Sequence, residues 1–202
     1  MKKEVQYALW VSLGIVVLVA LDQALKLWVH AHFEIGESLP LTNWFWLCYI
    51  ENDGMAFGIE WFSKLLLTLF RIAAVGLLVW YIVTLVKRVI KNPPTDPIGF
   101  KSVRRMNGYI AMIMMVTAGA LGNIVDCLCY GIAFGYAPLF YGRVIDMLYF
   151  PLIHNADGEV LFFQPVFNLA DSYITVSVAL IIIFFTKDFN SSFAEAETQT
   201  DK

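Results

Sequence analysis

Four long runs of apolar residues, almost free of charge, constrain this chain more than any other feature of its sequence. They extend from about Tyr7 to Val29, Lys64 to Val86, Gly108 to Asp126 and Leu169 to Thr186. A helix needs about 20 consecutive apolar residues to cross a bilayer, and each run is close to that length. Hydrophobic residues make up 59% of the 202-residue chain, more than in most soluble domains. The sequence therefore predicts an α-helical integral membrane protein, a bundle of four transmembrane helices.

The distribution of Lys and Arg predicts how these helices are oriented. Lys2 and Lys3 precede the first run, and six more cations lie around the connection between the second and third runs: Lys87, Arg88, Lys91, Lys101, Arg104 and Arg105. Residues 30–63 carry no Lys or Arg, and residues 127–168 carry only Arg143. Because cytoplasmic loops are enriched in Lys and Arg, both termini and the middle connection are expected in the cytoplasm. The first run has no small-residue cleavage site at its end, so we expect it to be a retained anchor rather than a signal peptide.

The two segments on the outer side are expected to be ordered. Residues 38–58 mix aromatic residues with turn formers, which predicts short strands at the membrane interface, a small β-rich periplasmic element. Residues 127–168 form a longer, extended periplasmic loop with a predicted turn at residues 155–158. The chain is polar and acidic from Asp188 onward, which predicts a disordered cytoplasmic tail over residues 188–202, after a membrane domain of residues 1–187.

Four carboxylates from different parts of the chain are predicted to lie at one depth, near the outer surface. Asp22 lies about 22 Å into the first run, counted at 1.5 Å per residue. Asp126 ends the third run, Asp171 opens the fourth, and Asp146 lies in the second outer segment. Ionisable residues inside membrane helices are costly and commonly functional. These carboxylates, with three asparagines at a similar level, therefore predict a polar site on the outer side: Asn52, Asn123 and Asn168.

Each carboxylate also has a purely structural explanation. Asp22 and Lys26 are four residues apart, as in a helical ion pair. Asp126 is explained equally by a solvated helix end, Asp146 by an exposed loop charge, and Asp171 by the favourable field of a helix N-terminus. The residues alone leave three classes open: an aspartyl hydrolase, a small transporter or channel, and a non-catalytic membrane scaffold. A transporter would carry its charges nearer mid-membrane, often within repeats, and neither is seen here.

Five short motifs occur in order along the chain. They are Asp22-Gln23-Ala24-Leu25-Lys26, Asn52-Asp53-Gly54-Met55-Ala56-Phe57, Gly122-Asn123-Ile124-Val125-Asp126, Val144-Ile145-Asp146 and Phe167-Asn168-Leu169-Ala170-Asp171. Together they resemble the DQxxK, NxGxAF, GNxxD, VVD and FNxAD motifs of the bacterial lipoprotein signal peptidases, or signal peptidase II. The resemblance covers nearly all of the chain except the tail. It implies an aspartyl endopeptidase of the bacterial inner membrane that removes signal peptides from prolipoproteins, on the amino side of the diacylglyceryl-modified cysteine.

The resemblance also implies a role for each motif residue. Asp146 and Asp171 fall on the catalytic pair, and the supporting positions are Asp22, Lys26, Asn52, Gly54, Asn123, Asp126 and Asn168. The expected partners are diacylglyceryl-modified prolipoproteins and membrane lipids, with no nucleic acid, and the protein is expected to be a monomer. The three Cys and three His residues form no metal-ligand pattern, so no metal or cofactor is expected. The GxGD signature of another class of intramembrane aspartyl protease does not occur in the sequence.

Two features depart from the family pattern. Cys127 stands where the third motif usually continues with Arg, and the stretch from Asp126 to Asp146 is longer, through an insertion around residues 131–141. Arg143 is the only Lys or Arg in that stretch. Our hypothesis is that Arg143 takes the role of the missing Arg near the substrate. The alternative is that it anchors the loop at the membrane interface.

Two neighbouring carboxylates suit amide hydrolysis because both cannot ionise cheaply, so they share a proton. The ionised member takes a proton from water, and the protonated member polarises the carbonyl group that is cleaved. The helix start after Asn168 favours a charged Asp171. We therefore expect Asp146 to carry the shared proton.

Overall fold

The computed structural model describes residues 3–53, 62–91, 103–154, 160–162 and 165–190. Its long helices are α1 (Lys3–His32), α2 (Phe62–Lys91), α3 (Val103–Val125) and α5 (Leu169–Leu180). Two of them are extended by π-helical turns: α3 by η1 (Asp126–Tyr130), followed by the short α4 (Gly131–Ala133), and α5 by η2 (Ile181–Phe185). Within these described residues, four stretches of helix are long and apolar enough to cross a membrane, and each contains one of the predicted runs. The prediction of a four-helix membrane protein is confirmed.

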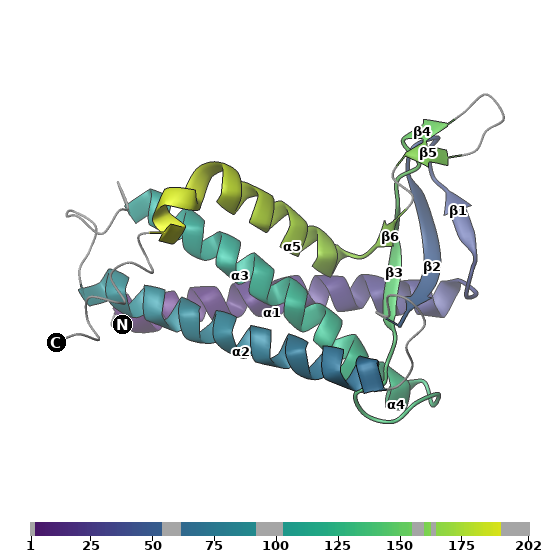
Figure 1. Ribbon diagram of the computed structural model, residues 1–202, viewed down its shortest axis with the longest axis horizontal. Helices are drawn as coiled ribbons and strands as arrows, with labels where there is room; N and C mark the ends of the chain where they lie inside the picture. The colour runs from purple at the N-terminus through teal and green to yellow at the C-terminus, as the bar shows by residue number, and fades with distance from the viewer. Residues whose placement is uncertain (1–2, 54–61, 92–102, 155–159, 163–164, 191–202) are drawn as a thin grey trace.

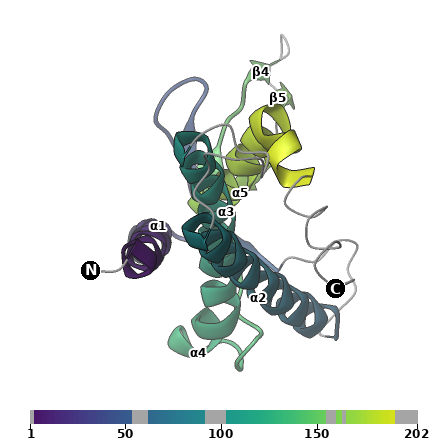
Figure 2. The same cartoon turned by 90° about the vertical axis from the view of Figure 1, so that its left-hand side faces the viewer.

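The helices are grouped around α3. Seen end-on, α1, α2 and α5 lie on different sides of α3, and each packs against it (Figure 2). Large apolar side chains point away from the bundle, including Leu13 of α1 and Phe70 and Trp80 of α2, which are 59%, 70% and 62% exposed. Such faces are unfavourable in water but match the acyl chains of a bilayer. The outward-facing residues therefore fit a chain that is solvated by lipid.

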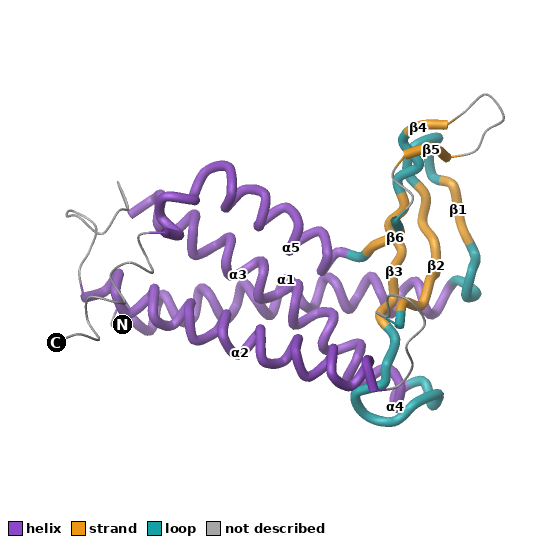
Figure 3. Tube along the Cα trace, in the orientation of Figure 1, coloured by secondary structure: helices purple, strands orange, loops and turns teal. Residues whose placement is uncertain are grey.

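An antiparallel sheet stands across one end of the bundle, which we call the sheet end (Figures 1 and 3). Its strands, in spatial order, are β1 (Ser38–Pro40), β2 (Trp46–Asn52), β3 (Val144–Tyr149) and β6 (Val166–Phe167), and β4 (Ile153–His154) pairs separately with β5 (Val160–Phe162). The register of β2 on β3 places Ile50 opposite Asp146 and Asn52 opposite Val144. The strands predicted within residues 38–58 are confirmed as far as residue 53. Residues 54–61 and the predicted turn at 155–158 lie outside the described residues.

The interior is layered along the bundle axis. At the end opposite the sheet, the helices meet in an apolar cluster that includes Val11, Ile82, Tyr109 and Ile113. Beneath the sheet lies a second apolar cluster of Val29, Tyr49, Tyr130, Ile145 and Met147. Between the two clusters lie several buried polar and charged side chains, among them Asp22, Lys26, Asn123 and Asp126. The fold therefore contains a layer of buried charge near the sheet end.

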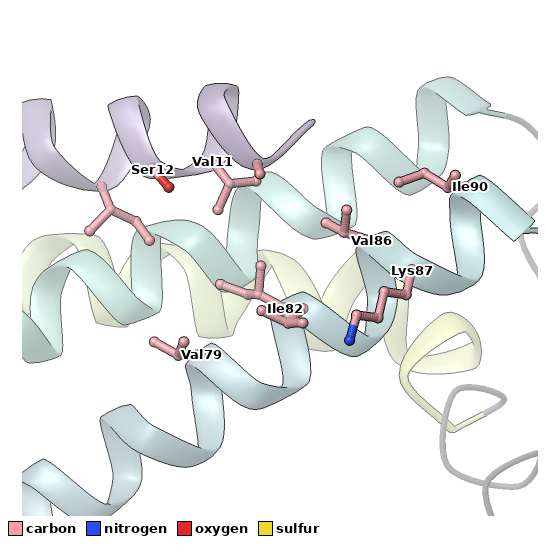
Figure 4. A pocket seen from close by; sticks show the side chains of 10 residues that line it. Val11, Ser12, Val79, Ile82, Val86, Lys87 and Ile90 are labelled. Atoms are coloured by element: carbon pink, nitrogen blue, oxygen red, sulfur yellow. The ribbon is translucent and has the colours of Figure 1, made fainter. Parts of the chain in front are cut away.

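A groove of about 750 Å³ opens between α1 and α2 at the opposite end of the bundle (Figure 4). Val11 and Ser12 line it from α1, and Val79 and Val86 from α2, with Lys87 as the one charged lining residue. A groove with these walls accepts apolar chains but offers no pair of groups for acid–base chemistry. It is therefore separate from the polar layer.

The boundary predicted for the tail is wrong for residues 188–190. Helix continues from η2 through Asn190, and Asp188 is 1% exposed. The Asp188 carboxylate accepts hydrogen bonds from Arg105 Nε at 2.9 and 3.1 Å, which ties the end of this helix to the start of α3. This partly buried ion pair holds an otherwise polar segment against the bundle. Residues 191–202 lie outside the described residues.

Gly119 brings α3 close to α5. A Cβ at this position would overlap the Ala170 carbonyl oxygen and lie 2.7 Å from Ile174 Cγ1. We expect Gly119→Ala to lower the free energy of unfolding by about 1–3 kcal/mol, because the helices must separate. Gly76→Ala in α2, where a Cβ meets nothing within 4 Å, is the matched control and should leave stability unchanged or slightly raised. Thermal unfolding in detergent measures both, and equal melting temperatures for the two variants would contradict the close packing of α3 on α5.

Candidate active site at the sheet end

Asp146 and Asp171 lie on different elements and are joined by two asparagines. Asp146 lies in β3 and is 2% exposed, whereas Asp171 lies in the first turn of α5 and is partly exposed. The Asn168 side chain accepts a hydrogen bond from the Asp171 backbone N–H (2.9 Å) and donates one to Asp146 Oδ1 (2.7 Å). Asn123 donates to Asp171 Oδ1 (2.7 Å) and accepts from Asn168 Nδ2 (3.1 Å). The two carboxylates therefore have a fixed relative position.

The environment of Asp146 favours the proton-bound form. Its Oδ2 accepts a hydrogen bond from Asn52 Nδ2 at 3.0 Å, from the neighbouring strand β2. Burial raises the pKa of Asp146, the hydrogen bond from Asn52 lowers it, and the nearby charge of Asp171 raises it again, to about 6. A carboxyl group with such a pKa exchanges its proton near neutral pH, as acid–base chemistry requires. Asp146 is therefore not the exposed loop charge that its sequence position allowed.

Asp171 offers an open oxygen beside this group. Its Oδ1 is held by Asn123, but Oδ2 accepts no hydrogen bond from any group in the described part of the chain. Since Asp171 is also partly exposed, Oδ2 is accessible to a water molecule. Asn168 is the N-cap of α5, so the helix N-terminus stabilises negative charge on Asp171. The pair thus combines a buried, proton-binding carboxyl with one that is open to water.

Lys26 is completely buried in the layer behind the pair. Its Nζ lies 2.8 Å from Asp22 Oδ2, 2.7 Å from Asp126 Oδ2 and 3.1 Å from Asn123 Oδ1. Asp22 and Lys26 are therefore more than a local helical pair, because the ammonium group joins α1 to α3. Asp126 is 0% exposed, which rules out the interpretation of a solvated helix end. The other oxygen of Asp22 accepts a hydrogen bond from the Ala170 backbone N–H (2.9 Å) and so reaches α5.

Gln23 belongs to the same layer, although sequence reasoning assigned it no role. Its amide donates to Asp126 Oδ1 (2.8 Å) and to the Gly122 carbonyl oxygen (3.1 Å), and its Oε1 accepts from Tyr130 (2.9 Å). Asp126 and Tyr130 are the first and last residues of the π-helical turn η1. π-turns are rare and often occur at functional sites. Gln23 therefore holds both ends of this turn, and its place in the first motif was the available signal.

Arg143 lies at the outer edge of the site. Its guanidinium binds Glu51 Oε2 (2.9 Å) and Asp53 Oδ1 (3.2 Å), and Asp53 also pairs with Lys64 at 2.5 Å. Burial raises the pKa of Asp53, but the hydrogen bond and charge of Lys64 and the charge of Arg143 outweigh it, so the pKa lies below its ordinary value. We call Glu51, Asp53, Lys64 and Arg143 the outer clamp. The hypothesis that Arg143 contacts the substrate stays a prediction, and the alternative role as an anchor remains open.

Arg71, and not Arg143, contacts Cys127, the residue that stands where the family pattern has Arg. Arg71 of α2 donates from Nη1 to Cys127 Sγ at 3.0 Å. With Lys64 and Thr68, it forms a polar face on the sheet end of α2, which sequence reasoning missed. The signal was present, because Arg71 is a charged residue inside a predicted span. Charged residues within membrane helices are commonly functional.

The structure thus brings together most of the predicted site residues. One connected set of hydrogen bonds and ion pairs contains eight of them: Asp22, Lys26, Asn52, Asn123, Asp126, Asp146, Asn168 and Asp171. Gly54 lies outside the described residues, and Arg143 lies on the outer clamp. No group of three His, Cys, Asp or Glu side chains placed to hold a metal ion is found within the described residues. Four membrane helices with two linked carboxylates at one end define a membrane enzyme with the groups for acid–base hydrolysis.

Comparisons with known proteins assign the family. The family model described as signal peptidase (SPase) II matches residues 14–187. The lipoprotein signal peptidase of Porphyromonas gingivalis (strain ATCC 33277) is 34% identical over 197 residues, covering 86% of this chain and 81% of that protein. The lipoprotein signal peptidase of Amoebophilus asiaticus is 36% identical over 195 residues, covering 86% and 77%. A solved bacterial membrane enzyme aligns with a TM-score of 0.55 at 26% identity, covering 89% of this chain and 88% of that one.

This chain belongs to the signal peptidase II family. It is therefore an aspartic peptidase of the membrane, and the transporter and scaffold interpretations are wrong.

The buried ammonium group of Lys26 predicts a strong effect on stability. Lys26→Met would leave Asp22 and Asp126 buried without their cation, which typically costs about 3–5 kcal/mol. We expect a large drop in the melting temperature in detergent and poor recovery from membranes. Lys87→Met, an exposed cation on α2, is the control and should leave both unchanged. A stable Lys26→Met protein would show that the ion pairs do not hold the helices together.

Proposed function

We propose that this chain removes signal peptides from prolipoproteins, cutting on the amino side of the diacylglyceryl-modified cysteine at the Asp146–Asp171 pair. The observation that carries the proposal is the bridge through Asn168, which binds both aspartates at 2.7 and 2.9 Å. The lipoprotein signal peptidases that resemble the chain support the same substrate class. A pair of linked carboxylates at one end of a lipid-facing bundle suits a peptide bond that lies close to a lipid anchor.

The chemistry follows from the two environments. Asp171, stabilised as an anion by the N-terminus of α5, takes a proton from a water molecule at its open Oδ2. Asp146, with its raised pKa, donates a hydrogen bond to the scissile carbonyl oxygen and stabilises the charge that develops there. The leaving amine then receives the proton that was taken from water. Asn123 and Asn168 keep the two carboxylates in position throughout.

The proposed location places the sheet end on the periplasmic side of the bacterial inner membrane. The cations that flank the membrane helices lie mostly at the other end of the bundle. Lys87 and Arg88 lie near the end of α2, and Arg105 lies near the start of α3. Because cytoplasmic loops are enriched in Lys and Arg, that end and both termini face the cytoplasm. The diacylglyceryl group would then enter from the outer leaflet, beside the sheet. We expect the protein to act as a monomer, because one copy of the chain supplies all the residues of the polar site.

Single replacements of either aspartate test the catalytic pair. Asp146→Asn and Asp171→Asn keep the shape of each side chain but remove its acid–base function, so each should reduce cleavage of a diacylglyceryl-modified prolipoprotein by at least about 1000-fold. Glu34→Gln, an exposed carboxylate near the sheet end, is the control and should retain full activity. Cleavage is followed by gel shift in membranes with equal amounts of inserted enzyme. Substantial activity in either aspartate variant would refute the pair.

The pH profile tests which aspartate carries the proton. If Asp146 acts in its protonated form, kcat/KM is highest below the pKa of about 6 and falls as the pH rises through that value. Asn52→Ala removes the hydrogen bond that lowers this pKa, so the falling limb should move to higher pH. Profiles of the wild type, Asn52→Ala and Glu34→Gln are compared in the same detergent. A limb that rises near pH 6 instead would assign the role of the base to Asp146.

A further inference from the structure

Arg71 is an arginine within a membrane helix, and it has no carboxylate partner among the described residues. Its one polar contact among the described residues is the bond to Cys127 Sγ, and a cysteine sulfur is a weak acceptor. A guanidinium carries five N–H donors, so most of its hydrogen-bonding capacity is unused by the protein. Charged donors at membrane depth are costly unless they find acceptors. Arg71 is therefore placed to bind oxygen atoms that the described part of the chain does not supply.

Arg71 contacts the helical segment that also carries Asn123. Cys127 follows Asn123 by four residues and lies in the π-helical turn η1 that continues α3. Asn123 binds Asp171, and Cys127, one turn closer to the sheet end, binds Arg71. The guanidinium of Arg71 thus reaches from α2 to the segment whose Asn123 holds Asp171. Arg71 also contacts Cys127, which occupies the position where the family motif usually has Arg.

Arg71 lies on the boundary between the polar site and the lipid. It is half-buried, whereas its neighbours Phe70 and Ile72 are 70% and 38% exposed on the outer face of α2. Lys64, in the outer clamp, lies about 10 Å nearer the sheet end along the helix, at 1.5 Å per residue. The guanidinium is therefore deeper than the charged surface and level with apolar, lipid-facing side chains. Glycerol ester groups, which lie between the charged surface and the acyl chains, offer acceptors at this depth.

We propose that Arg71 binds the ester carbonyl oxygens of the diacylglyceryl group on the substrate cysteine. The inference rests on the proposed function and adds a specificity-determining residue to it. Arg fits this task because its planar fork presents two parallel donors to two acceptors and remains charged at membrane depth. With the glycerol held at Arg71, the acyl chains lie along the exposed apolar face of α2, past Phe70 and Leu77. The thioether sulfur of the modified cysteine is then directed toward the aspartate pair.

The experiment compares two substrates in lipid-free detergent micelles. One is a prolipoprotein peptide whose cysteine carries the diacylglyceryl group, and the other carries the same chains through ether linkages, which lack the carbonyl oxygens. We expect the wild type to prefer the ester substrate by about tenfold in kcat/KM, mainly through KM, as for the loss of a hydrogen bond to a charged group. Arg71→Gln should cleave both substrates equally, and Arg71→Lys should regain part of the preference. Lys87→Gln, a cation at the far end of α2, should keep the full preference.

The ratio between the substrates separates the possible outcomes. An unchanged ester preference in Arg71→Gln overturns the proposal, and so does an equal loss of activity on both substrates, which indicates a structural role. A defect of Arg71→Gln that appears only when phospholipid is added assigns the guanidinium to bilayer lipid instead and also overturns it. If the wild type cleaves neither substrate, the proposed function itself fails. Since each result is a ratio within one protein, a partly unstable variant remains informative.

Discussion

The buried ammonium group of Lys26 is the interaction on which the rest of the structure depends. Helices in lipid gain no hydrophobic free energy from meeting one another, so their arrangement relies on close packing and polar contacts. Lys26 of α1 is completely buried and binds Asp126 and Asn123 at the sheet end of α3. Through Asp22, the same charge is linked to the backbone at the start of α5. One cation therefore determines how three of the four helices meet.

This cation also orients the asparagines that hold Asp146 and Asp171. Asn123 turns its oxygen toward Lys26 and Asn168, which leaves its N–H group to donate to Asp171. Asn168 likewise uses its oxygen to cap α5, so its amide nitrogen is available to Asn123 and Asp146. Each side-chain amide has one direction that satisfies all its neighbours. The same hydrogen bonds therefore stabilise the bundle and position Asp146 and Asp171.

The sequence predicts those parts of the molecule that depend on local patterns of apolar and charged residues, rather than on contacts between distant segments. Apolar runs located the four helices, and counting along them placed Asp22, Asp126 and Asp171 near one level. Counting placed Asp146 only within the second outer segment, because its exact depth is set by the pairing of β3 with β2. The π-helical turn η1 and the helical residues 188–190 were missed for a related reason. Both are held by side chains distant in sequence, Gln23 and Arg105, and no local periodicity marks them.

The balance of charge explains why Arg71 differs from the other cations near the site. The outer clamp pairs Lys64 and Arg143 with two carboxylates, and Lys26 is shared by two more. Among the described Lys and Arg residues at the sheet end, only Arg71 has no carboxylate partner. The buried layer contains two carboxylates and one ammonium group, and Asp146 and Asp171 lie beside it, so a nearby cation is electrostatically favoured there. An arginine already held by a carboxylate would bind a neutral ester poorly. Arg71 keeps its donors for such a ligand while its charge is balanced by the site beside it.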